Sequence, residues 1–140
     1  MTTLARRLAA VLGEVLPVVE ESDGALTVRH AATVASLRVV PIGEGLDLVS
    51  LTQVVGWDLP LSRTLREQVE RQAAGTLLGT VAVVAKEVDQ PAAGRRGTDK
   101  TADVMLRYNF PGTGLTDDAL RTLVLLVLDK GAEIRDALRG

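Results

Sequence analysis

The chain has 140 residues, 46% of them hydrophobic, so it is long and apolar enough for one folded domain, predicted to span residues 1–140. A formal net charge of −2 and an aromatic content of 2% argue against a nucleic-acid partner, because neither a basic surface nor a stacking platform is available. The lack of cysteine excludes disulfides, thiolate metal sites and thiol catalysis.

Residues 3–16 are predicted to form an amphipathic helix that ends before Pro17. Two arginines followed by apolar residues are similar to the start of a signal peptide, but Glu14 interrupts the apolar run. No run in the sequence reaches the roughly 18 apolar residues that a membrane-spanning helix needs. We therefore expect a cytoplasmic protein without a membrane partner.

Three extended segments are predicted next, at residues 25–30, 33–42 and 46–55, because each is β-branched or alternates apolar with polar residues. The "GEG" at 43–45 indicates a hairpin loop that joins the second segment to the third. These segments therefore predict antiparallel neighbours in one sheet.

A short amphipathic helix is expected after Gly56 and Pro60, which interrupt the strand pattern. Its apolar residues recur every four positions, and Thr64 together with Glu67 fits a capping box at its start.

The segment 76–88 is apolar in both of its alternating sets. One set contains Val81 and Val83, and the other contains Ala82 and Val84. This pattern predicts a strand that is covered on both faces.

Residues 89–101 are rich in glycine, proline and charge, and are predicted to form a flexible hairpin loop before a strand at 102–110. A long helix is predicted at 116–138, with Thr116 as its N-cap. Most of its apolar residues form one stripe, but two leucines lie on the shoulders of that stripe, Leu125 and Leu126.

The order α-β-β-β-α-β-β-α predicts an α+β fold in which three helices pack on a mainly antiparallel, five-stranded sheet. The pattern resembles the type III secretion chaperone-like fold, and in particular YbjN-type proteins. The resemblance rests on the stretches "ASLRVVPIGEGLDLVSLTQVVGWDLP", "GTLLGTVAVVAKEV" and "LTDDALRTLVLLVLDKGAEIRDAL". It implies a small homodimer that binds other proteins through hydrophobic surfaces, in a chaperone-like or regulatory role, and it supplies no catalytic residues. Thirteen arginines against three lysines indicate a GC-rich bacterial genome.

No sequence motif for catalysis, cofactor binding or metal binding is present, so we expect neither an enzyme nor a cofactor or metal site. The leading hypothesis is a non-enzymatic protein-binding module that uses apolar side chains left over from the core to form a homodimer or to bind a protein client. Trp57 can anchor a contact, although a tryptophan in this setting more often joins the core. The candidate contact residues are Leu125, Leu126, Val81, Val83 and Trp57.

The alternative is a small-molecule sensor or small enzyme with a pocket between the sheet and the helices. Its polar candidates are His30, Arg107 and Tyr108.

Overall fold

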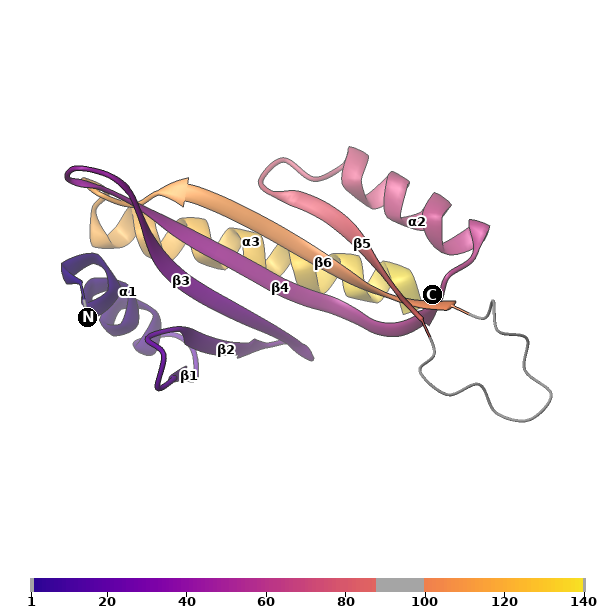
Figure 1. Cartoon of the computed structure of the whole chain (residues 1–140), viewed down its shortest axis with the longest axis horizontal. Helices are drawn as coiled ribbons and strands as arrows, with labels where there is room; N and C mark the ends of the chain where they lie inside the picture. Colours follow the sequence, from indigo (N-terminus) through magenta and orange to yellow (C-terminus); the bar gives the residue numbers. More distant parts are fainter. Residues whose placement is uncertain (1, 88–99, 140) are drawn as a thin grey trace.

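The protein forms a six-stranded antiparallel sheet with three helices on one face (Figure 1), in a computed structural model that describes residues 2–87 and 100–139. The strands lie in the order β1-β2-β3-β4-β6-β5. Along the chain the elements are α1 (Thr3–Gly13), β1 (Val18–Glu20), β2 (Leu26–His30), β3 (Thr33–Gly43), β4 (Leu46–Pro60), α2 (Arg63–Ala74), β5 (Thr80–Glu87), β6 (Lys100–Pro111) and α3 (Asp117–Arg139).

The predicted α+β class and the predicted order of helices and strands are confirmed, with one strand added. β1 was not predicted because it has only three residues, too few to show an alternation. It pairs antiparallel with β2, from Val18 opposite Val28 to Glu20 opposite Leu26, and extends the sheet at that edge. α1 ends at Gly13, three residues earlier than predicted.

The core lies between the three helices and one face of the sheet. The strands β2, β3, β4 and β6 each bury one alternating set of side chains there, such as Leu51 in β4 and Leu106 in β6, which are both fully buried, whereas β1 and β5 contribute partly buried valines. α3 runs along the length of the sheet behind the strands in Figure 1, and both α1 and α2 pack against it. The helices contribute Leu4, Leu8 and Leu12 from α1, Leu65 and Val69 from α2, and Leu120, Val124, Val127, Leu128 and Ile134 from α3.

β5 is an edge strand, and the prediction that it is covered on both faces is wrong. Val81 and Val83 lie opposite Leu106 and Val104 of β6, so they face the helices and pack against the core. Their neighbours in the other alternating set face the side of the sheet that no helix of the described chain covers. Apolar residues in both alternating sets of a strand show only that its side chains are apolar. Whether both faces are buried depends on whether the fold has helices on one or both sides of the sheet.

β4 continues through Gly56 to Pro60, where the sequence indicated a break. Its pairing with β6 shifts register between Val54 and Gly56 and again between Gly56 and Leu59. Such bulges let a strand absorb irregular residues without ending. Pro60 is the last residue of the strand, where the missing N–H matters least.

The structure also corrects the end of the predicted loop and the cap of α2. Lys100 and Thr101 belong to β6, where they pair with β5, and residues 89–99 of the predicted loop lie outside the described residues. The N-cap of α2 is Ser62, whose Oγ accepts the N–H of Leu65 at 3.1 Å, instead of Thr64.

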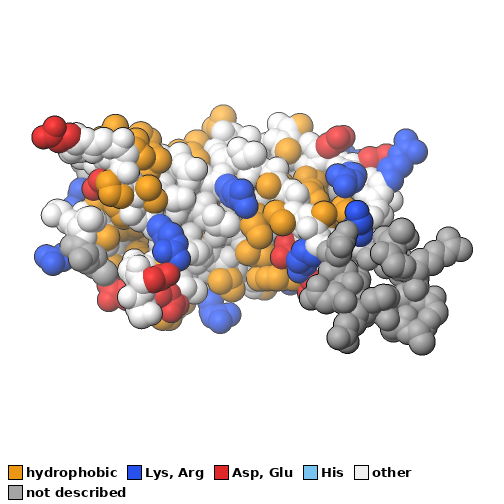
Figure 2. All heavy atoms as spheres, in the orientation of Figure 1, with side chains coloured by type: hydrophobic (Ala, Val, Ile, Leu, Met, Phe, Trp, Pro, Cys, Tyr) orange, Lys and Arg blue, Asp and Glu red, His pale blue; other side chains and the backbone are white. Residues whose placement is uncertain are grey.

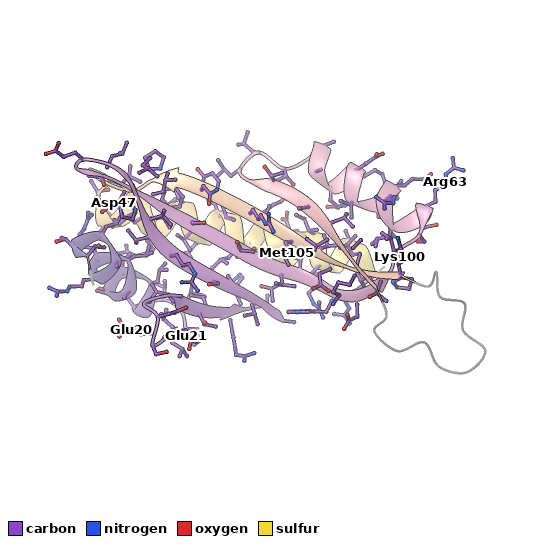
Figure 3. The ribbon with its side chains drawn as sticks, viewed as in Figure 1. Glu20, Glu21, Asp47, Arg63, Lys100 and Met105 are labelled. Carbon is purple, nitrogen blue, oxygen red and sulfur yellow. The ribbon has the colours of Figure 1, made fainter. Side chains whose placement is uncertain are left out.

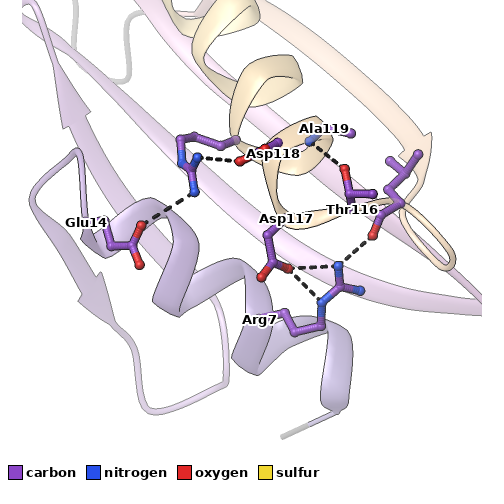
Figure 4. A network of polar contacts seen from close by, with 8 residues as sticks. Arg7, Glu14, Thr116, Asp117, Asp118 and Ala119 are labelled. Carbon is purple, nitrogen blue, oxygen red and sulfur yellow. Dashed lines mark hydrogen bonds and ion pairs between the residues drawn. The ribbon is translucent and has the colours of Figure 1, made fainter.

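The start of α3 is tied to α1 by two arginines (Figure 4). Thr116 Oγ1 accepts the N–H of Ala119 at 3.1 Å, as the predicted N-cap should. Arg7 of α1 donates to Asp117 Oδ1 from Nε at 3.0 Å and from Nη2 at 2.9 Å, and Nη2 also donates to the carbonyl of Leu115. Arg121 of α3 lies between Asp118 of the same helix and Glu14, the residue that caps the end of α1. These contacts hold the first and last helices side by side.

A buried glutamine determines how α3 lies on the sheet. Gln53 of β4 is fully buried, and its Nε2 donates to Thr33 Oγ1 at 2.8 Å and to the carbonyl of Leu128 in α3 at 3.1 Å. Its Oε1 occupies the space beside Gly131, where a Cβ atom would lie only 1.9 Å away. Gly131 therefore leaves room for a side chain of the sheet in the middle of α3.

Candidate functional site

An open apolar groove of about 420 Å³ lies between α3 and the segment that joins α2 to β5. Two of its leucines are exposed: Leu77 at 93% and Leu126 at 54% of their surface. The remaining lining residues are Gly75, Leu78, Val127, Asp129, Lys130 and Glu133. Exposed leucines beside an apolar groove are unusual on a free surface and indicate a contact site.

The segment from Gly75 to Gly79 is shaped by its ends. Thr76 Oγ1 donates to the carbonyl of Gln72 at 2.7 Å and so closes the end of α2. Gly79 has a φ of +89°, and a Cβ there would lie 2.7 Å from the carbonyl oxygen of Arg107 in β6. Only glycine fits both this conformation and this approach. Between these fixed ends Leu78 packs against the core and Leu77 projects into solvent.

The α3 side of the groove follows from the helical period. The buried stripe of α3 uses Val124, Val127 and Leu128, so Leu126 falls outside it and remains exposed. Charges of both signs surround the groove: Lys130 lies 3.5 Å from Glu133, and Asp129 Oδ1 lies 2.8 Å from His30 Nε2.

The other four predicted contact residues lie elsewhere. Leu125 is half-buried on α3 and does not line the groove. Val81 and Val83 are half-buried against the core on the helix side of β5. Trp57 lies near the end of β4 and is 41% exposed, with the guanidinium of Arg135 at 5.6 Å from its ring centre. Of the five predicted residues, only Leu126 lines the groove.

Sequence reasoning missed Leu77, the most exposed large apolar residue of the described chain. Residues 76–88 were predicted as one strand, which placed Leu77 in the same alternating set as Val81 and Val83. The signal that could have found it is the pair of glycines at 75 and 79, which indicates a turn around the two leucines.

One charged cluster on the sheet changes the ionisation of its members. The hydrogen bond to Asp103, and then the one to Asp58, raises the pKa of Lys86 above its ordinary value. Burial alone would raise the pKa of Asp103, but the hydrogen bond from Lys86, the N–H of Asp58 and the charge of Lys86 together hold that pKa below its ordinary value. This three-residue cluster has one positive and two negative groups, so it carries a net charge of −1, and it links β4, β5 and β6.

The three polar residues of the alternative hypothesis do not come together. Tyr108 faces the helix side and stacks on Phe110 with ring centres 5.1 Å apart. Arg107, its neighbour in the strand, points to the opposite face. His30 lies at the end of β2 against Asp129 of α3. None of them lines the groove.

Within residues 2–87 and 100–139, no group of three histidine, aspartate or glutamate side chains is arranged to hold a metal ion. In the same part of the chain, none of the helices combines the length and the apolar character needed to cross a bilayer.

Comparison with solved structures agrees with the architecture. No family model and no curated protein matches the chain. The crystal structure of YbjN from E. coli, described as a proposed transcription regulator, is similar to it with a TM-score of 0.54. The similarity covers 93% of this chain and 84% of that one, at 13% sequence identity. The chain therefore belongs to the class of α+β proteins with this arrangement of sheet and helices. In particular, it has a YbjN-type fold.

Proposed function

We propose that the protein is a non-enzymatic protein-binding module with a regulatory role, and that it forms a homodimer through the groove between α3 and the α2–β5 segment. The observation that carries the proposal is the position of Leu77, a nearly fully exposed side chain next to an apolar groove. A projecting residue beside a groove is self-complementary, because a two-fold axis places each Leu77 against the groove of the other copy.

The charges around the groove support a second copy as its occupant. Lys130 is flanked by Asp129 and Glu133 on the same helix. A two-fold related copy presents the same pattern in reverse, so that each Lys130 faces carboxylates of the partner.

A regulatory role through protein contacts is consistent with the description of YbjN as a proposed transcription regulator. With a net charge of −2, this chain is better suited to contact a protein than to contact DNA. The separation of His30, Tyr108 and Arg107 favours the binding module over the small enzyme or small-molecule sensor.

Multi-angle light scattering after size exclusion tests the dimer. At high micromolar concentration the wild-type chain should have about twice its monomer mass of 14.8 kDa. Leu77→Asp and Leu126→Asp should each be monomeric, because a carboxylate loses its hydration when it is buried against the apolar part of the groove.

Val19→Asp is the matched control, since Val19 is 57% exposed on β1, the edge strand of the sheet opposite to β5. It should remain dimeric. A wild-type monomer at these concentrations, or a dimer that persists in both groove variants, would reject the proposed interface.

A further inference from the structure

The face of the sheet opposite the helices carries an apolar band that crosses four strands. Val34 of β3 lies opposite Val54 of β4, Val54 lies opposite Met105 of β6, and Met105 lies opposite Ala82 of β5. We call these four residues the transverse band; all of them are half-buried. Figure 3 shows Met105 near the middle of this face. The three helices lie on the other side, so no helix in the described chain covers the band.

Two arginines flank the transverse band and have no carboxylate partner within the described residues. Arg29 of β2 lies opposite Val34 and so stands at one end of the row. Arg107 of β6 lies next to the band, and its Nη2 is 3.8 Å from Met105 Sδ. Both arginines are exposed.

The other cations on this face are already neutralised. Arg38 pairs with Asp23 at 2.7 Å, and Lys86 pairs with Asp103 at 2.7 Å and with Asp58. Figure 2 shows basic and apolar side chains along the middle of this face, whereas the acidic side chains lie mainly toward its ends. Lys86 with its two aspartates carries a net charge of −1, so the basic groups that remain available beside the band in the described chain are the guanidinium groups of Arg29 and Arg107 themselves.

We propose that the transverse band binds an acidic amphipathic segment of a partner protein, with apolar side chains on Val54 and Met105 and carboxylates on Arg29 and Arg107. Charge-assisted hydrogen bonds to guanidinium groups are among the strongest that a surface can offer, which favours carboxylates as their partners. A second copy of the same face does not fit, because it would bring arginines against arginines.

The spacing of the strands indicates the shape of the segment. Strands lie about 4.8 Å apart and residues about 3.4 Å apart along a strand, so three strand spacings and the two-residue offset of Arg107 separate the two arginines by about 16 Å. A helix rises about 1.5 Å per residue, so a helix that crosses the strands would place carboxylates about ten residues apart, with its apolar stripe between them. This is a recognised way for a helix to bind a surface, and it uses a different face from the dimer groove.

Fluorescence anisotropy with two synthetic peptides tests the proposal. The first probe is a labelled amphipathic peptide of about 14 residues with leucines on one face and glutamates near both ends; the second has lysines in place of the glutamates. The wild-type chain should prefer the glutamate peptide. Arg29→Glu/Arg107→Glu should bind the glutamate peptide about tenfold or more weakly and should bind the lysine peptide better than the wild type does.

Three controls make the result specific to this face. Arg66→Glu removes an exposed arginine of α2 and should leave the affinity for the glutamate peptide unchanged. Leu126→Asp should also leave it unchanged, whether or not the chain is a dimer, so failure of the dimer proposal is distinguishable from failure of this one. Met105→Ser should weaken binding, because the loss of an apolar contact surface is independent of charge.

The proposal is overturned if the wild type binds neither peptide, if it binds both equally, or if the double arginine variant keeps its affinity for the glutamate peptide. It is also overturned if Leu126→Asp abolishes binding, because the peptide would then lie in the groove. Tighter binding of a duplex DNA oligonucleotide, lost in the double arginine variant, would assign the face to nucleic acid instead. Circular dichroism of each variant confirms that the sheet is intact.

Discussion

Gly131 shows how a single residue of α3 is determined by a residue of the sheet. Glycine in a helix interior costs about 1 kcal/mol relative to alanine, so helix propensity alone disfavours it. The side-chain amide of Gln53 fills the space of the missing Cβ and donates to the carbonyl of Leu128, one turn earlier in the helix. The Nε2 group of this amide is thereby buried with two acceptors, whereas its Oε1 is buried without a hydrogen-bond donor, so the amide is only half satisfied.

Gly131→Ala should lower the free energy of unfolding by about 1–3 kcal/mol, because its Cβ would overlap Gln53 Oε1 at 1.9 Å. Urea unfolding followed by circular dichroism measures the change. Gly13→Ala is the control, since nothing lies within 4 Å of a Cβ at that helical position, and it should be neutral or slightly stabilising. The double variant Gln53→Ala/Gly131→Ala should lose less stability than the sum of the losses in the two single variants, because the overlap is absent once Gln53 is shortened. Strict additivity would contradict the steric explanation.

The partners of Gln53 lie beyond the reach of sequence patterns. Alternation along β4 places it in the same set as Leu51, but Thr33 and Leu128, to which it donates, are 20 and 75 positions away. Leu77 was misplaced for a different reason. The alternating pattern of β5 was extended backwards over residues 76–79, which form a turn. The shape of that turn depends on the close approach of Gly79 to the backbone of Arg107 in β6.

Among the elements, the turn between β2 and β3 is strained, because it places two alanines in a backbone conformation that suits asparagine and glycine better. His30 pairs with Thr33, so only Ala31 and Ala32 make the loop, and their φ angles are 46° and 64°. Two-residue hairpin loops with two positive φ angles favour asparagine followed by glycine. Alanine in this region costs roughly 1–2 kcal/mol per residue, because its Cβ crowds the following carbonyl oxygen.

Ala31→Asn/Ala32→Gly should therefore raise the free energy of unfolding by about 1 kcal/mol, after the greater flexibility of glycine in the unfolded chain is subtracted. Thermal and urea unfolding measure this gain. Ala10→Gly in α1 makes a comparable alanine-to-glycine change in a helix, where a loss of about 1 kcal/mol is expected. A loss of stability in the turn variant as well would show that the alanines are not strained.

Local periodicity predicted most elements, because most of them bury one face. The stripe of α3 and the hairpin of β3 and β4 follow directly from it. It failed at β1, which is too short for a period, and at β5, where apolar character on both sides does not reveal that the sheet has helices on one side only. The number of layers is a property of the whole chain.

For the whole molecule, Arg7 links the two ends of the described chain. It bonds Asp117 and the carbonyl of Leu115, more than a hundred positions away. Arg7→Leu should lower the free energy of unfolding by about 1–2 kcal/mol, of which the partly exposed ion pair supplies at most about 1 and the carbonyl bond the rest.

The control for Arg7→Leu is Arg63→Leu, which removes a pair with Glu67 in which the arginine is 93% exposed. That change should cost less than about 0.5 kcal/mol. Urea unfolding compares the two. Equal effects would mean that Arg7 acts only as an ordinary surface charge and does not anchor α1 on α3.

The two candidate binding surfaces are also properties of the whole molecule, because each combines residues from distant parts of the chain. The groove joins Leu77 and Leu126, and the transverse band joins residues from four strands. The sequence predicted an excess of apolar side chains and named Leu126 among them. It could not predict their grouping, because that depends on strand order and on the side of the sheet that the helices occupy.

All six strands precede α3 in the chain, and α3 covers the middle of their inner face. During translation, the ribosome therefore completes the sheet before it makes the helix that shields it. Until α3 has emerged, the apolar inner face of the sheet lacks its cover, and partly folded chains that expose such surface are prone to aggregate unless a chaperone binds them.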